Sequence, residues 1–82
     1  MIKLNTQIEA LERVQEKIQE KIEALEEKKE AIEEKAYERE SGELTEKEYE
    51  RIEAIEEQIE ELQQESDDIE TALDYLRDYL EW

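Results

Sequence analysis

The sequence predicts an all-α protein, an antiparallel coiled-coil hairpin of two long helices, and three observations carry that prediction. Leucine and isoleucine recur with a seven-residue period on both sides of Gly42, a pattern typical of a supercoiled helix seam. The two repeats mirror each other, because residues whose numbers add up to 84 are both apolar along much of the chain. The chain has one glycine and no proline, so nothing interrupts a long helix on either side of position 42.

Folding the chain about Gly42 brings the two apolar repeats together in pairs. The paired residues are Leu4 with Leu80, Ile8 with Leu76, Leu11 with Leu73, Ile22 with Leu62, Leu25 with Ile59, and Ile32 with Ile52. Three seam positions are polar, namely Gln15, Lys29 and Ser66. Gln15 and Ser66 fall in adjacent layers, close enough for a hydrogen bond, and we interpret them as residues that fix the register. The alternative is a soft spot where a ligand or a partner helix inserts.

Local signals place the ends of the helices at about residues 5–40 and 46–81, with a turn at 41–45. Thr6 and Glu9 form a Thr-x-x-Glu pattern near the first helix start, and Gly42 supplies a left-handed residue after the helix. Thr45 and Glu48 then form a capping box at the start of the second helix. A kink near Ser66 is an alternative to a continuous second helix, but the unbroken apolar register favours continuity.

The chain fits a single domain, residues 1–82, and it is strongly acidic. It has 28 acidic and 11 basic residues, for a formal net charge of -17. Residues 42–82 hold 16 of the acids and 3 of the bases, and no base lies between Arg51 and Arg77. An acidic surface repels nucleic acids and anionic membranes and attracts basic proteins. We therefore expect a basic protein partner, such as a nucleic-acid-binding enzyme, and no direct binding of nucleic acid or membrane.

The residue types that support catalysis and cofactor binding are largely missing. There is no histidine to carry protons near neutral pH and no cysteine to serve as a nucleophile or metal ligand. Neither a glycine-rich phosphate loop nor an EF-hand pattern occurs. We expect a protein that is not an enzyme and that binds no cofactor and no metal ion.

Targeting signals are also missing from the sequence. No apolar run approaches the ~20 residues that cross a bilayer, and the polar residues 1–5 do not read as a signal peptide. We expect a cytoplasmic protein, located in the host cytoplasm if the chain is viral.

The second helix carries an unusual density of carboxylates. Nine acidic residues lie between Glu53 and Glu70, along roughly 27 Å of helix, or about one per 3 Å. Phosphates along one DNA strand are spaced by about 3.4 Å. The candidate phosphate substitutes are Glu53, Glu57, Glu60, Glu61, Asp67, Asp68 and Asp74. The alternative is a face that only solvates the coiled coil.

Aromatic and small apolar residues gather at the end of the hairpin opposite the turn. They form one stripe beside the seam, where they either close the end of the core or anchor an interface. This candidate patch consists of Ile2, Ala10, Val14, Ala72, Tyr75, Tyr79 and Trp82. Ala24 and Ala31 extend an apolar shoulder along the first helix, so we expect two hairpins to pair as a homodimer, a four-helix bundle.

These features favour a small inhibitor that presents its acidic helix to a basic protein. In size, charge and helicity the chain is similar to small phage proteins that block restriction or CRISPR enzymes (anti-restriction and anti-CRISPR proteins), and the resemblance implies the same class of function. The main alternative is a structural or assembly coiled coil, an adaptor, spacer or oligomerisation module. A designed coiled coil without a partner fits the regular heptads, but not the terminal aromatic residues.

Overall fold

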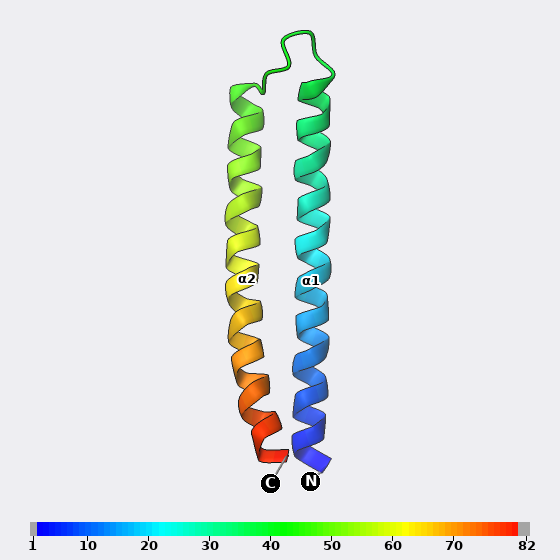
Figure 1. Cartoon of the computed structure of the whole chain (residues 1–82), viewed down its shortest axis with the longest axis vertical. Helices are drawn as coiled ribbons and strands as arrows, with labels where there is room; N and C mark the ends of the chain where they lie inside the picture. The colour runs from blue at the N-terminus through cyan, green and yellow to red at the C-terminus, as the bar shows by residue number, and fades with distance from the viewer. Residues whose placement is uncertain (1, 81–82) are drawn as a thin grey trace.

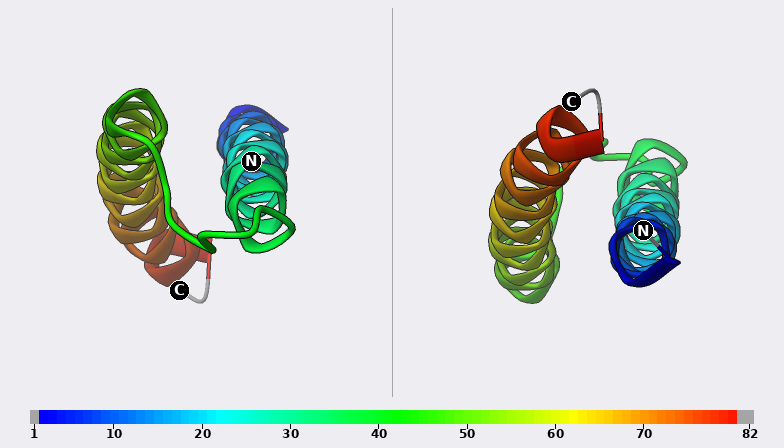
Figure 2. Two further views of the ribbon diagram at one scale, coloured as in Figure 1. Left: turned by 90° about the horizontal axis from the view of Figure 1, so that it is seen from above. Right: turned by 90° about the horizontal axis from the view of Figure 1, so that it is seen from below.

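The described part of the chain forms two long antiparallel helices (Figure 1), which confirms the predicted fold class. The computed structural model describes residues 2–80, with side chains from residue 4 onward. Helix α1 spans Ile2–Tyr37, helix α2 spans Glu46–Leu80, and the molecule measures 62 × 15 × 15 Å. Seen end-on, α2 sweeps sideways along its length relative to α1, as the helices of a coiled coil do (Figure 2).

The seam contains the residues that the heptads assign to it. The buried hydrophobic residues are Ile8, Ile18, Ile22, Ala36, Ile52, Ile55 and Leu73. Two cross-helix contacts give the register, because Gln15 Nε2 donates to Glu70 Oε2 at 2.8 Å and Lys29 Nζ lies 3.2 Å from Glu56 Oε1. The residue numbers in both pairs add up to 85, close to the 84 of the predicted pairing, which supports the mirror register. Gln15 and Ser66 line the same surface hollow, as expected, but the Gln15 amide bonds Glu70 instead.

The first helix extends further at its start, and stops sooner at its end, than the predicted range of 5–40. It begins at Ile2, so Thr6 and Glu9 lie inside the helix, since no proline or glycine prevents another turn before them. It ends at Tyr37, because the amide of Arg39 donates to the Ala36 carbonyl at 3.2 Å and tightens the last turn. The second helix begins at Glu46 as predicted, and its predicted last residue, 81, lies outside the described residues.

A separate turn over residues 38–45 reverses the chain. The Gly42 amide donates to the Arg39 carbonyl at 3.0 Å, and Gly42 has a φ of 64°, the left-handed conformation expected of it. The predicted capping box is confirmed, since the Thr45 amide donates to Glu48 Oε1 at 2.8 Å and the Glu48 amide donates to Thr45 Oγ1 at 3.2 Å. Gly42 therefore closes the turn between the helices and does not cap α1 directly.

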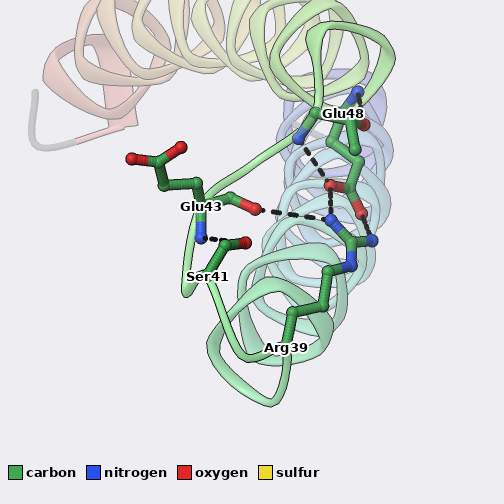
Figure 3. A network of polar contacts seen from close by, with 5 residues as sticks. Arg39, Ser41, Glu43 and Glu48 are labelled. Atoms are coloured by element: carbon green, nitrogen blue, oxygen red, sulfur yellow. Dashed lines mark hydrogen bonds and ion pairs between the residues drawn. The ribbon is translucent and has the colours of Figure 1, made fainter.

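An ion pair that the sequence did not predict links the start of the turn, just after α1, to the first turn of α2 (Figure 3). Arg39 lies just after α1, and both of its terminal nitrogens donate to the Glu48 carboxylate, at 2.5 Å each. Arg39 Nη1 also donates to the Glu43 carbonyl at 3.4 Å. The Arg39 guanidinium, followed by the Thr45 amide, lowers the pKa of Glu48 from 4.5 to about 2. One carboxylate thus caps α2 and holds the end of α1 beside it.

Helix α2 is continuous through Ser66, as the apolar register predicts. Its axis curves over its last turns (Figure 1). In this region the Thr71 hydroxyl donates to the Asp67 carbonyl at 3.0 Å, a contact that often bends a helix.

We expect Leu73→Ala to destabilise the hairpin by about 2–5 kcal/mol, because Leu73 has no exposed surface and its truncation leaves a cavity in the seam. Urea unfolding followed by circular dichroism at 222 nm measures this cost. Leu80→Ala is the matched control, since Leu80 is 41% exposed and its truncation should cost much less. Equal losses from the two variants would contradict the packing described above.

The lowered pKa of Glu48 predicts a pH-dependent contribution to stability. The charged carboxylate stabilises the folded state above pH 4.5, and this contribution is lost as the pH falls from 4.5 toward 2. Glu48→Gln keeps an oxygen that can accept the Thr45 amide but loses the ion pair with Arg39. We expect the wild-type chain to be more stable than this variant at pH 7 and the difference to vanish near pH 2, measured by thermal unfolding.

The comparison between variants matters, because many other carboxylates are protonated over the same range. Glu50→Gln, an exposed acid on the same helix, removes the same charge without touching the turn. A pH-dependent loss as large for Glu50→Gln as for Glu48→Gln would show that the Arg39 contact is not responsible.

Candidate interaction surfaces

The hairpin has two broad sides, one on each flank of the seam, and cross-helix contacts show which residues share a side. On one side a hollow brings Glu26 and Lys29 of α1 together with Glu53, Glu56 and Glu60 of α2. Residues seven positions apart stay on the same side of a supercoiled helix, and we call such a series of residues a row. The contacts in the hollow therefore show on which side of the hairpin each row lies. Charge is distributed very differently over the two sides.

We call the first side the acidic face. It contains fourteen exposed carboxylates, half from each helix. They are Glu9, Glu12, Glu16, Glu23, Glu26, Glu30 and Glu33 of α1, and Glu46, Glu53, Glu56, Glu60, Asp67, Glu70 and Asp74 of α2. The acidic surface is therefore a joint product of both helices and not of α2 alone.

Two cations and one amide relieve repulsion where the acids of the two helices meet. Arg77 lies 3.6 Å from Glu12 on α1, 3.7 Å from Glu70 and 3.9 Å from Asp74. Glu70 also accepts the hydrogen bond from Gln15. Nearer the turn, the contact of Lys29 with Glu56 plays the same part beside Glu26. The remaining carboxylates of the acidic face are exposed to solvent.

We call the opposite side the mixed face. It is lined by lysines, alanines and aromatic residues, with few acids, and two hollows on it expose apolar side chains of the seam. Its α1 residues are Ala10, Val14, Lys17, Lys21, Ala24, Lys28, Ala31 and Lys35, and its α2 residues are Lys47, Arg51, Ala54, Gln58, Glu61, Glu65, Asp68, Ala72, Tyr75 and Tyr79.

The fold divides the seven acids proposed as phosphate substitutes. Four of them share one row of the acidic face, and these are Glu53, Glu60, Asp67 and Asp74. Glu57 lies next to them and borders the same hollow as Glu53 and Glu60. Glu61 borders a hollow of the mixed face with Lys21 and Ala24, and Asp68 follows it seven residues later. The fold therefore separates Glu61 and Asp68 from the other five.

The predicted aromatic patch falls within the mixed face. Val14 is 45% exposed, Tyr75 is 69% exposed and Tyr79 is 66% exposed, so these side chains do not close the core. Ala10 and Ala72 are exposed in neighbouring rows. Trp82 lies outside the described residues, as does the side chain of Ile2.

The sequence places Glu12 opposite Glu70 and Glu26 opposite Glu56, but the proposed binding surface was assigned to the second helix alone and left out all seven acids that α1 adds to the acidic face. The signal was present in the heptads, because those acids occupy the two rows that flank the seam on the side of Glu56 and Glu70. Arg77 was also missed, since its role depends on Glu12, which lies on the other helix.

The described residues contain no group of three acidic side chains placed to hold a metal ion. Neither helix, over its described length, is both long and apolar enough to cross a membrane. Comparisons with protein-family models, curated proteins and solved structures find no match to this chain.

We expect Arg77→Gln to destabilise the hairpin at low ionic strength by about 1 kcal/mol or less, because it leaves Glu12 and Glu70 facing each other. The loss should shrink in about 1 M salt, which screens surface charges. Arg51→Gln is the control, because it removes the same charge from an exposed site on the mixed face of the same helix. Thermal unfolding at low and high salt separates the two. A salt-independent loss, or an equal loss for Arg51→Gln, would contradict the bridging role of Arg77.

Proposed function

We propose that this chain is a non-enzymatic interaction protein that inhibits a basic, nucleic-acid-binding protein by occupying its nucleic-acid site with the acidic face. We propose that it acts in the cytoplasm, or in the host cytoplasm if the chain is of phage origin. The partner is a protein, since the same face repels nucleic acids and anionic membranes.

The charge density of the acidic face carries the proposal. Its fourteen carboxylates lie along roughly 42 Å of helix, about one per 3 Å. One strand of DNA carries a phosphate about every 3.4 Å. The density of a nucleic-acid strand is thus met on a single side of the molecule, where one basic groove can contact all of it.

The rigidity of the hairpin supports the same proposal. The two helices are held in register by the seam and by the contact between Arg39 and Glu48, so the carboxylates are positioned before binding. A preorganised surface loses less conformational freedom on binding than a flexible acidic tail does. The partner's lysines and arginines then exchange the phosphates of nucleic acid for carboxylates at similar spacing.

A structural or assembly role is the second candidate function. The observation that favours it is the exposure of Tyr75, Tyr79 and Val14 on the mixed face, because tyrosines are common anchors of protein interfaces. In that role the carboxylates would only keep the coiled coil solvated. The two functions make opposite predictions for neutralising the acidic face.

Neutralising one row of the acidic face should weaken capture of the partner by roughly tenfold or more, since four charged contacts are lost. The variant combines Glu53→Gln, Glu60→Gln, Asp67→Asn and Asp74→Asn. Immobilised wild-type and variant chains are incubated with a nuclease-treated cell extract, and retained proteins are eluted with salt or with a single-stranded oligonucleotide. We expect the wild type to retain nucleic-acid-binding proteins that the oligonucleotide displaces.

The control variant removes four charges from the outward rows of the two helices, which hold none of the fourteen carboxylates of the acidic face. It combines Glu20→Gln, Glu27→Gln, Glu34→Gln and Glu50→Gln. It should retain the same proteins as the wild type and with the same salt dependence. Equal retention by all three chains, or retained proteins that the oligonucleotide does not displace, would discard the proposed inhibition.

A further inference from the structure

The seam is covered unequally on its two flanks. Apolar seam residues nearer the acidic face are mostly buried, as are Ile8, Ile22, Ile52 and Leu73. Those nearer the mixed face are mostly half-buried, and these are Leu4, Leu11, Leu25, Ile32, Leu62, Ile69 and Leu76. Leu25, Ile32 and Leu62 line the hollows of the mixed face directly. Two helices alone therefore leave the flank of the core beside the mixed face more exposed to water than the other flank.

The mixed face is also the one broad side of the hairpin without a large negative charge. It holds six cations and three acids in a molecule of net charge -17. The cations are Lys17, Lys21, Lys28, Lys35, Lys47 and Arg51, and the acids are Glu61, Glu65 and Asp68. Two copies that meet through this face keep their acidic faces apart, so electrostatic repulsion opposes their association least here.

Small residues on the mixed face allow a second copy to approach closely. Five of the six alanines of the chain lie there, while the sixth, Ala36, is buried in the seam. The open end adds the exposed side chains of Val14, Tyr75 and Tyr79. A rectangle with the length and width of the molecule, 62 by 15 Å, covers on the order of 900 Å². Stable interfaces bury about 800 Å² per partner.

Charge complementarity selects one orientation of the second copy. The α1 half of the mixed face has cations and no acids, whereas the α2 half holds all three acids near its middle. Packing α1 against α1 of the second copy would oppose lysines with lysines. Packing α1 against α2 of the second copy brings Lys17 and Lys21 to the level of Glu65 and Asp68, while only Lys35 meets a like charge, that of Arg51.

We infer that two copies of this chain pair through their mixed faces into a four-helix bundle, with α1 of each copy against α2 of the other. The two-fold axis runs along the length of the hairpins, so both turns lie at the same end. Residues of α1 and α2 that lie at the same height in one hairpin then also lie at the same height across the interface. Ala31 of one copy is therefore opposite Ala54 of the other, and Ala10 is opposite Tyr75. Neighbouring helices are all antiparallel, as in common four-helix bundles.

The oligomeric state tests the interface. Sedimentation equilibrium between about 1 and 100 µM, the range in which weak and stable dimers separate, should give twice the 9.9 kDa mass of one chain. Ala31→Glu combined with Ala54→Glu places like charges opposite each other and should return the mass to one chain. A wild-type mass of 9.9 kDa throughout this range would overturn the inference.

The control keeps the added charge and changes its place. Gln64→Glu combined with Thr71→Glu lies on the outward row of α2 and should leave the dimer intact. Circular dichroism verifies that each variant keeps its helices. Val14→Glu combined with Ala72→Glu is a second interface variant if the first loses them. A folded interface variant that remains dimeric would overturn the inference.

Cross-linking tests the orientation, because the chain has no cysteine of its own. When Ala31→Cys chains are mixed with Ala54→Cys chains and oxidised, we expect a disulfide between the two variants, which requires Cα atoms within about 7 Å. If α1 instead packed against α1 with the turns at opposite ends, Ala31→Cys would link to Val14→Cys. That second product would overturn the proposed orientation.

The inference is independent of the proposed binding of a basic protein, since the acidic faces point outward on both sides of the bundle. The experiments also separate the two ideas. The interface variants leave every carboxylate of the acidic face in place, and the four-acid variant leaves the mixed face unchanged. A monomeric wild type that captures nucleic-acid-binding proteins would overturn the dimer alone.

Discussion

The structure depends on the burial of one narrow apolar stripe on each helix against its mirror image on the other. Among the described residues, neither helix has an apolar partner other than the second helix, and seven hydrophobic side chains are buried. Burial of this stripe offsets the conformational entropy of ordering the chain. Because it uses about two positions in each heptad, the other positions are free to carry charge, and this freedom produces the two contrasting faces.

The turn fixes the register of the seam. A coiled-coil seam can slip by whole heptads with little change in apolar contact, since one layer resembles the next. The pairing of Arg39 with Glu48, the reciprocal bonds of Thr45 and Glu48, and the left-handed Gly42 fix the first layer. Every later level follows from it, including the contact of Arg77 with Glu12 at the far end.

Much of the fold could be predicted because the periodic residues act through local and repeating geometry. The seam, its register, the capping box and the left-handed glycine were all predicted from the sequence. The end of α1 was not, because Arg39 lies in register with the seam and its partner Glu48 is a residue of the next helix. The candidate surface was predicted only in part. When the acids of the second helix were considered alone, Glu61 and Asp68 were grouped with Glu53. Each face is formed by both helices, so its residues can be assigned only after the two helices are aligned.

The mirrored heptads also make the length of the molecule adjustable in fixed steps. Seven residues removed from one helix alone would leave seven on the other without partners. Removing one heptad from each helix at matching levels, such as residues 22–28 and 56–62, keeps the turn and both ends and shortens the rod by roughly 10.5 Å. Each such step removes two layers of the seam, in this example Ile22 with Leu62 and Leu25 with Ile59, and shortens both faces by the same length. The length of the hairpin can therefore change only in steps of one heptad on each helix. Related chains of other lengths should differ by paired insertions of seven residues.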